Sequence, residues 1–215
     1  MEPHVGQPIV TLGKPLEASR AAMIMIHGRG AAPQNILELS DAFGHPGFTY
    51  LAPAAAGHTW YPHSFLADTA RNEPGLSSGL QVIERLVGEV VRHGIAKENI
   101  LLLGFSQGAC LAAEFAARHA DRYGGVLIYS GGLIGPPGTT WVYDGSFDET
   151  PVFLGCSDVD AHIPRQRVDE SAAVFERMGA RVTKRIYPGM GHLINQDEID
   201  FTRALMQQLA PGEPA

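Results

Sequence analysis

The chain contains few cysteines, no cluster of basic residues and no long apolar segment. Its 215 residues include only two cysteines, Cys110 and Cys156. We therefore expect no disulfide framework and predict two free, partly buried thiols. Lys and Arg number 16 against 23 Asp and Glu, a formal net charge of −7. This balance argues against nucleic acid or an anionic membrane as the main partner, because both reward clustered positive charge.

The apolar segments are too short to span a bilayer, and the first residues lack the positive charge and apolar stretch of a signal peptide. We therefore expect no membrane span and a cytoplasmic location. The length fits one domain, residues 1–215, and a hydrophobic fraction of 45% is ordinary for a globular protein.

Short apolar runs alternate with longer segments of helical periodicity, which is typical of an α/β fold with a mostly parallel sheet. Strands are expected at residues 21–26, 48–51, 100–103, 125–129, 151–154 and 181–187. Helices are expected at residues 80–91, 107–119, 164–178 and 195–209. Ser77 or Ser78 is the expected cap of the first helix, and Asn195 with Glu198 forms a capping-box pattern at the last.

Two longer segments, at about 52–76 and 131–150, lack a regular pattern. Each follows an expected strand, so both are expected at the carboxyl edge of the sheet, where open α/β folds bind ligands. No helical insertion follows the strand that ends at Tyr129, so we expect no separate cap domain.

A glycine-flanked serine, Gly104-Phe105-Ser106-Gln107-Gly108, lies between a buried strand and a helix. This strand–turn–helix setting is that of the nucleophile elbow in the α/β-hydrolase fold. The glycines are explained by a strained turn in which side chains two residues before and after the serine would collide with backbone. The pattern predicts Ser106 as a catalytic nucleophile, with the amide of Gln107 close to the developing oxyanion.

Five segments, in the same order, resemble the phospholipase/carboxylesterase family, which includes acyl-protein thioesterases and small bacterial carboxylesterases. They cover the serine turn, the Ile-His-Gly-Arg-Gly run at 26–30, the Trp-Tyr pair at 60–61, and the loops at 155–164 and 187–192. The resemblance extends over about residues 20–210. It implies an α/β-hydrolase fold with helices on both faces of the sheet. Similar family members often dimerise, so the resemblance allows a homodimer.

In this fold the acid is expected to follow the serine in the chain, and the histidine that acts as base is expected to follow the acid. His192, on a glycine-rich loop between the last strand and the last helix, is the predicted base. Asp158 and Asp160 both follow a strand. The family pattern has a proline four residues after the acid, as Pro164 follows Asp160, which favours Asp160 and leaves Asp158 as the alternative. The loop departs from that pattern in its greater length and in Ala161, where a proline commonly stands.

By the same resemblance, the backbone amides of Arg29 and Gln107 form the oxyanion hole. The guanidinium of Arg29 is expected either to face the mouth of the site, where it binds a substrate carboxylate, or to lie in solvent. His27 is expected to hydrogen-bond backbone beneath this loop.

An aromatic-rich loop at the active edge is expected to form the substrate pocket, because pockets are usually apolar with a few polar groups. The expected wall residues are Trp60, Tyr61, His63 and Phe65, with Leu133, Trp141 and Tyr143 as weaker candidates. The alternative interpretation is that Trp60 and Phe65 only hold the loop to the core.

These features predict a serine carboxylic-ester hydrolase that forms an acyl-enzyme with short-chain or aryl esters of small molecules. The alternatives are acyl-protein thioesterase or lysophospholipase-type activity, and a non-catalytic binding module on the same fold. His58 and His63 do not form a His-Glu-x-x-His pattern, so we expect neither a metal nor a cofactor.

Overall fold

A single seven-stranded sheet runs through the protein, which is described by a computed structural model over residues 2–211. The strand order is β1-β3-β2-β4-β5-β6-β7, and every neighbouring pair is parallel except β1 with β3. The strands are β1 (Ile9–Gly13), β2 (Ala21–Ile26), β3 (Phe48–Pro53), β4 (Ile100–Phe105), β5 (Gly125–Tyr129), β6 (Pro151–Ser157) and β7 (Arg181–Tyr187).

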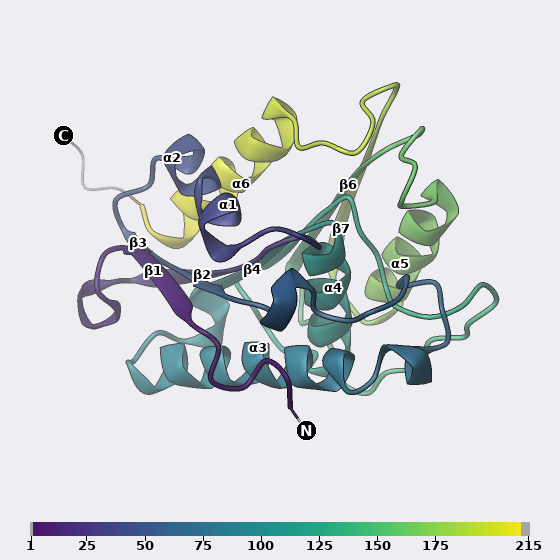
Figure 1. Ribbon diagram of the computed structural model, residues 1–215. Helices are drawn as coiled ribbons and strands as arrows, with labels where there is room; N and C mark the ends of the chain where they lie inside the picture. The colour runs from purple at the N-terminus through teal and green to yellow at the C-terminus, as the bar shows by residue number, and fades with distance from the viewer. Residues whose placement is uncertain (1, 212–215) are drawn as a thin grey trace.

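Helices cover both faces of the sheet (Figure 1). One face packs against α1 (Pro33–Leu37), α2 (Leu39–Phe43) and α6 (Gln196–Leu209). The other packs against α3 (Gly75–Arg92), α4 (Gln107–Arg118) and α5 (Arg165–Arg177). The predicted α/β-hydrolase architecture, with a mostly parallel sheet between two helical layers, is confirmed.

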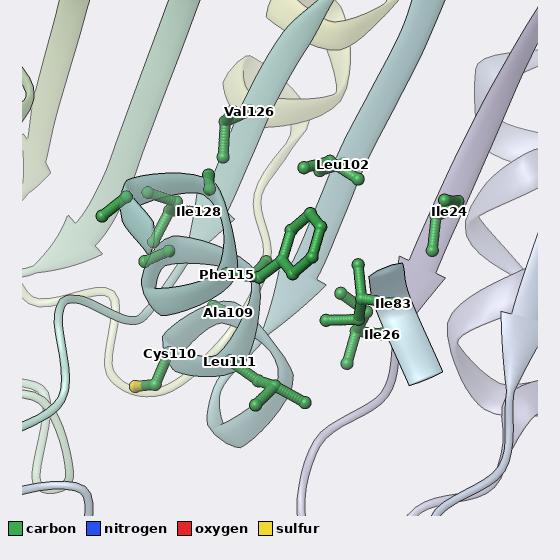
Figure 2. Close-up of a cluster of buried hydrophobic side chains, with 14 of the residues drawn as sticks. Ile24, Ile26, Ile83, Leu102, Ala109, Cys110, Leu111, Phe115, Val126 and Ile128 are labelled. Atoms are coloured by element: carbon green, nitrogen blue, oxygen red, sulfur yellow. The ribbon is translucent and has the colours of Figure 1, made fainter. Parts of the chain in front are cut away.

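The apolar strands are explained by burial on both faces. Along β2, Ile24 and Ile26 belong to the cluster under α3 and α4, whereas Met23 and Met25 belong to the cluster under α1, α2 and α6. Figure 2 shows the first cluster, in which the side chain of Phe115 projects from α4 toward the strands. A strand covered on both sides needs an apolar residue at every position, which is why these segments show no alternation.

The predicted strands and longer helices occur where expected, with ends shifted by a few residues. Among the strands and α-helices of residues 2–211, three were not predicted: β1, α1 and α2. The side chains of β1 are mostly exposed because it is an edge strand, so it carries no apolar run. The other two are helices of five residues, too short for a helical period to be visible.

The caps of the helices agree with prediction at α6 and differ at α3. Asn195 Oδ1 accepts the amide of Glu198 at 3.0 Å, and Glu198 Oε2 accepts the amide of Asn195 at 2.8 Å, which confirms the capping box. The predicted serine cap of α3 is wrong, because the helix begins earlier, at Gly75. Ser78 lies inside the helix, where its Oγ accepts the amide of His4.

The carboxyl ends of the parallel strands meet at one edge, and the two long segments leave the sheet there. Residues 130–150 contain no helix, and within residues 2–211 no helical insertion covers this edge. In the same described range, no helix combines the length and the apolar character needed to cross a membrane.

Candidate active site

Ser106 occupies a strained turn between β4 and α4. Its backbone has φ 55° and ψ −119°, a conformation that L-residues rarely adopt. The amide of Ser106 donates to Tyr129 O of the neighbouring strand at 3.0 Å, and its carbonyl accepts the amide of Cys110 at 3.0 Å. The turn is thus fixed on one side by the sheet and on the other by the first turn of α4.

The two flanking glycines are required by close backbone approach, as the sequence predicts. A Cβ at Gly104 would lie 2.3 Å from Gly108 O, and one at Gly108 would lie 2.1 Å from Ile26 O. No side chain fits at these distances, so α4 can begin directly against β2 and β4 only with glycine at both positions.

A continuous chain of hydrogen bonds joins Ser106, His192 and Asp160. His192 Nε2 lies 2.8 Å from Ser106 Oγ, and its Nδ1 lies 2.7 Å from Asp160 Oδ2. The alternative acid, Asp158, does not contact His192; its Oδ1 accepts the amide of Gly189 at 2.8 Å. The structure therefore brings Asp160, and not Asp158, to the imidazole.

The carboxylate of Asp160 is held in its ionised form. Its Oδ1 accepts the amides of His162 and Ile163, at 2.8 and 3.0 Å. Burial raises the pKa of Asp160, but the hydrogen bonds from His192 and the two amides outweigh it, so the pKa lies below its ordinary value. Asp160 therefore keeps its negative charge beside the imidazole at neutral pH.

The backbone amides of Arg29 and Gln107 are free to bind a ligand oxygen. Neither amide donates to an acceptor within residues 2–211, and both residues line the cavity that contains Ser106. The amide of Gln107 also lies at the N-terminus of α4, where the helix dipole favours negative charge.

A cavity of about 500 Å³ opens beside Ser106. Of the four predicted wall residues, Tyr61, His63 and Phe65 line it. Trp60 does not: it is 0% exposed and its indole donates to His27 O at 2.9 Å, so it supports the loop from below. For Trp60 the alternative interpretation, that it holds the loop to the core, is the correct one.

The guanidinium of Arg29 lies at the cavity wall, bound to neutral carbonyls. It donates to the carbonyl oxygens of Tyr61, Pro62 and His63 at 2.8, 3.0 and 2.7 Å. The side chain of Arg29 is exposed and, within residues 2–211, makes no ion pair, but its three hydrogen bonds attach it to three consecutive residues of the aromatic loop.

Other buried polar groups brace the same loop. The side chain of Gln107 accepts the amide of Trp60 at 2.9 Å and donates to Tyr61 O at 2.8 Å. His27 Nε2 accepts the amide of Ala55, in line with its predicted role beneath the loop, and Nδ1 lies 2.8 Å from Gly28 O.

Two bracing residues, His4 and Asn72, were missed by sequence reasoning. His4 Nδ1 accepts the amide of Ala56 and its Nε2 lies 2.8 Å from Trp60 O. The buried amide of Asn72 accepts the backbone N–H of His63 at 2.9 Å and donates to the carbonyl of Ser64 at 3.0 Å. The hydrogen-bond partners of the His4 imidazole lie 52 and 56 residues later in the chain, and those of Asn72 lie in an irregular loop. No local sequence pattern therefore indicates either bracing residue.

The weaker pocket candidates lie away from the cavity lining. The indole of Trp141 donates to Ile134 O and stacks 4.7 Å from the guanidinium of Arg167. Tyr143 donates to the buried carboxylate of Glu114. Together with the fully buried Leu133, these residues order the segment 131–150 instead of forming the pocket.

Both cysteines are free and buried, as predicted. Cys110 lies at the cavity floor, where burial raises the pKa of its thiol to about 12. Burial and the neighbouring charge of Asp160 raise the pKa of Cys156 to about 12 as well. Both therefore remain protonated thiols near neutral pH, which are poor nucleophiles. Within residues 2–211, no group of three or more His, Cys, Asp or Glu is placed to hold a metal ion.

The sheet topology and the serine turn at the carboxyl edge define an α/β-hydrolase, and the comparisons with known proteins specify which one. The sequence model of the Phospholipase/Carboxylesterase family matches residues 9–209. The chain belongs to that family and is a serine hydrolase.

Its relatives include proteins with several names. Acyl-protein thioesterase 1 of Kluyveromyces lactis is 27% identical over 221 residues, which cover 93% of this chain and 97% of the relative. Lysophospholipase-like protein 1 of Mus musculus is 24% identical, with 90% and 88% covered. The crystal structure of a phospholipase/carboxylesterase from Dyadobacter fermentans is 38% identical, covers 96% of this chain and 98% of its own, and superimposes with a TM-score of 0.91.

The glycine turn gives a matched pair of substitutions with opposite expected effects. Gly108→Ala places a Cβ 2.1 Å from Ile26 O, so we expect the free energy of unfolding to fall, by about 3 kcal/mol or more. Gly88→Ala, within α3, meets only the flexible end of Arg92 at 3.4 Å, and is expected to stabilise by about 0.5–1 kcal/mol. Urea unfolding of the two variants tests this, and equal effects at both positions would contradict the close approach.

The buried histidines under the loop predict acid sensitivity. Desolvation lowers the pKa of His4 and of His27 below the ordinary value of 6.5, against the backbone hydrogen bonds that raise it. Below pH 6.5 the unfolded chain therefore binds protons that the folded protein does not bind. The stability that the two neutral histidines contribute is complete above pH 6.5 and is lost as the pH falls. Each histidine is expected to add a slope of up to about 1.4 kcal/mol per pH unit.

Urea unfolding between neutral pH and about pH 5.5 measures this slope. Glu198 acts in the opposite direction, because burial raises its pKa to about 7, so the test compares variants instead of absolute slopes. His4→Gln and His27→Gln are each expected to flatten the loss of stability, because each removes one buried imidazole whose pKa is lowered by desolvation. An unaltered slope in both buried variants would rule out this origin.

Proposed function

We propose that the protein hydrolyses carboxylic esters through an acyl-enzyme on Ser106, with His192 as general base and Asp160 as orienting acid. The observation that carries this proposal is the hydrogen-bond chain from Ser106 Oγ through His192 to Asp160, at 2.8 and 2.7 Å, on the wall of an open cavity. A serine activated by a base, which is itself oriented by a carboxylate, is the arrangement that acyl transfer requires.

In the first half-reaction, His192 Nε2 takes the hydroxyl proton as Ser106 Oγ attacks the acyl carbon. The amides of Arg29 and Gln107 stabilise the negative oxygen of the tetrahedral intermediate. Asp160 holds the imidazole with Nε2 toward the serine and stabilises its protonated form. When the intermediate collapses, the alcohol departs with the proton from His192, and the acyl group remains on Ser106.

In the second half-reaction, a water molecule attacks the acyl-enzyme. His192 takes its proton and returns it to Ser106 Oγ as the carboxylic acid leaves. No residue of the segment 130–150 lines the cavity, and in the proposed reaction water reaches the acyl bond through its open mouth. Each turnover therefore consumes one water and one ester and releases one alcohol and one acid.

The cavity supports short-chain or aryl esters as substrates. It has a volume of about 500 Å³, and its apolar lining includes Phe65, Phe105 and Ile163. A short acyl group or an aromatic ring fits within this volume. Apolar burial would then favour short acyl groups or an aromatic leaving group.

A thioester is the second candidate substrate, because several relatives carry the name acyl-protein thioesterase. The same acyl-enzyme forms from a thioester, since the thiolate departs in place of the alcohol. Lysophospholipase-type activity would use the same steps on a lipid ester. A cytoplasmic location and a homodimer stay predictions.

Ser106 provides the direct test. The wild-type protein is expected to hydrolyse 4-nitrophenyl acetate and butyrate and to be labelled by a fluorophosphonate probe, because both react with an activated serine. Ser106→Ala is expected to lose both while keeping the wild-type circular dichroism spectrum. An unlabelled wild type would favour a non-catalytic binding module. Labelling with turnover confined to long-chain lipids would retain the mechanism and reject the substrate class.

The two aspartates provide a matched pair. Asp160→Asn removes the charge that orients and stabilises the imidazolium, so kcat is expected to fall by about 1,000-fold or more. Asp158→Asn keeps an oxygen that can accept the amide of Gly189, so a fall of less than about tenfold is expected. Steady-state kinetics on 4-nitrophenyl butyrate measure both, and a larger loss in the Asp158 variant would reverse the assignment.

A further inference from the structure

The charge of the cavity lining differs from that of the whole protein. The chain has a formal net charge of −7. Within the described residues 2–211, no Asp or Glu side chain lines the cavity beside Ser106, whereas Arg29, His63 and His162 do. The carboxylate of Asp160 is 0% exposed behind His192. A ligand in the cavity therefore meets the positive charge of Arg29 and hydrogen-bond donors, and no carboxylate among the lining residues faces it.

The guanidinium of Arg29 is a fixed and uncompensated charge. Its three hydrogen bonds go to backbone carbonyls, at 2.7 to 3.0 Å, and in the described part of the chain no carboxylate lies within ion-pair distance of it. A guanidinium carries five N–H groups, so two remain for a ligand. The side chain is already ordered, so little conformational entropy is lost when it binds a ligand.

Two imidazoles from different loops add polar groups to the lining. His63 comes from the aromatic loop after β3, and His162 from the loop that carries Asp160. In residues 2–211, neither ring makes a hydrogen bond. The ring of His162 packs edge-on against His192, with 4.8 Å between centroids. An anionic group near Arg29 therefore has further donors within the same cavity.

We propose that the cavity selects esters that carry a carboxylate a few bonds from the scissile bond, and that Arg29 binds this carboxylate. The inference rests on the proposed esterase function and specifies its substrate class. The apolar part of the lining receives the intervening carbon chain or ring. A cationic ester is disfavoured, because it would approach Arg29 without a compensating carboxylate.

The test compares esters that share a reacting end and differ in the neutral, anionic or cationic group at the far end of the acyl chain. These are the 4-nitrophenyl esters of hexanoate, of adipate as its half-ester, and of 6-(trimethylammonio)hexanoate. A second pair places the charge on the leaving group: hexanoate esters of 5-hydroxy-2-nitrobenzoate and of its methyl ester. The quantity measured is the ratio of kcat/KM for the anionic ester to that for its neutral partner.

Arg29→Gln is expected to lower this ratio about tenfold for at least one pair of esters. This is the size of effect expected when a hydrogen bond between two charged groups is lost. Added salt is expected to lower the wild-type ratio and to leave that of the variant unchanged. Arg92→Gln makes the same change in net charge at the exposed end of α3, outside the cavity lining, and is expected to preserve the ratio.

The outcomes separate the inference from the proposed function. If Arg29 only orders the loop, Arg29→Gln lowers kcat/KM for anionic and neutral esters alike, and a ratio within about twofold of wild type in both pairs would overturn the inference. Faster turnover of the cationic ester than of hexanoate would also overturn it. Hydrolysis of none of the esters would instead reject the esterase function.

Discussion

The close packing of α4 against β2 and β4 is the constraint on which the site depends. Because Gly104 and Gly108 have no side chains, the first turn of α4 lies against the backbone of both strands. This approach forces the reversal of the chain at Ser106 into its positive-φ conformation. It also directs the N-terminus of α4 at the cavity that Ser106 lines, so one packing contact positions both the proposed nucleophile and the positive end of the helix dipole.

The other proposed catalytic groups come from loops, and each loop is fixed by polar contacts that these groups do not make themselves. Ser157 Oγ accepts the amides of Val159 and Gly191, which ties the acid loop to the histidine loop. Asp158 adds a second tie through the amide of Gly189. Asp158 thus contributes to the position of His192 without contacting it. The orientation of the imidazole is consequently determined from both the acid side and the chain that carries it.

The sequence allowed prediction of those features that depend on local pattern or chain order. The buried strands have apolar residues at every position, α6 has its capping box, and the glycine-flanked serine follows a strand. Features that depend on tertiary contacts were not predictable in this way. The sequence shows that Trp60 is aromatic and lies in a loop, but its burial depends on His27 O, which is 33 residues earlier.

The choice between the two aspartates illustrates the same limit. Asp158 and Asp160 are separated by one residue in one loop, and both have short side chains suited to hydrogen bonds with backbone. Only the path of the chain after β6 decides which carboxylate points to His192, and that path depends on amides of His162, Ile163 and Gly189. The proline spacing of the related family therefore carried information that the residue types alone did not.

An open cavity changes the way in which a hydrolase can select its substrate. Within residues 2–211 no helical insertion covers the cavity, and one methylene more or less changes binding by only about 1–3 kcal/mol even in a closed apolar pocket. Chain length is thus a weak basis for selection here. A charge at the edge of a partly apolar cavity acts differently, because its interaction with a ligand charge is stronger near a low-dielectric surface than in bulk water. Arg29 lines the same cavity as Ser106, and its backbone amide is a proposed member of the oxyanion hole, so in this proposal one residue would both bind the substrate's carboxylate and stabilise the oxyanion.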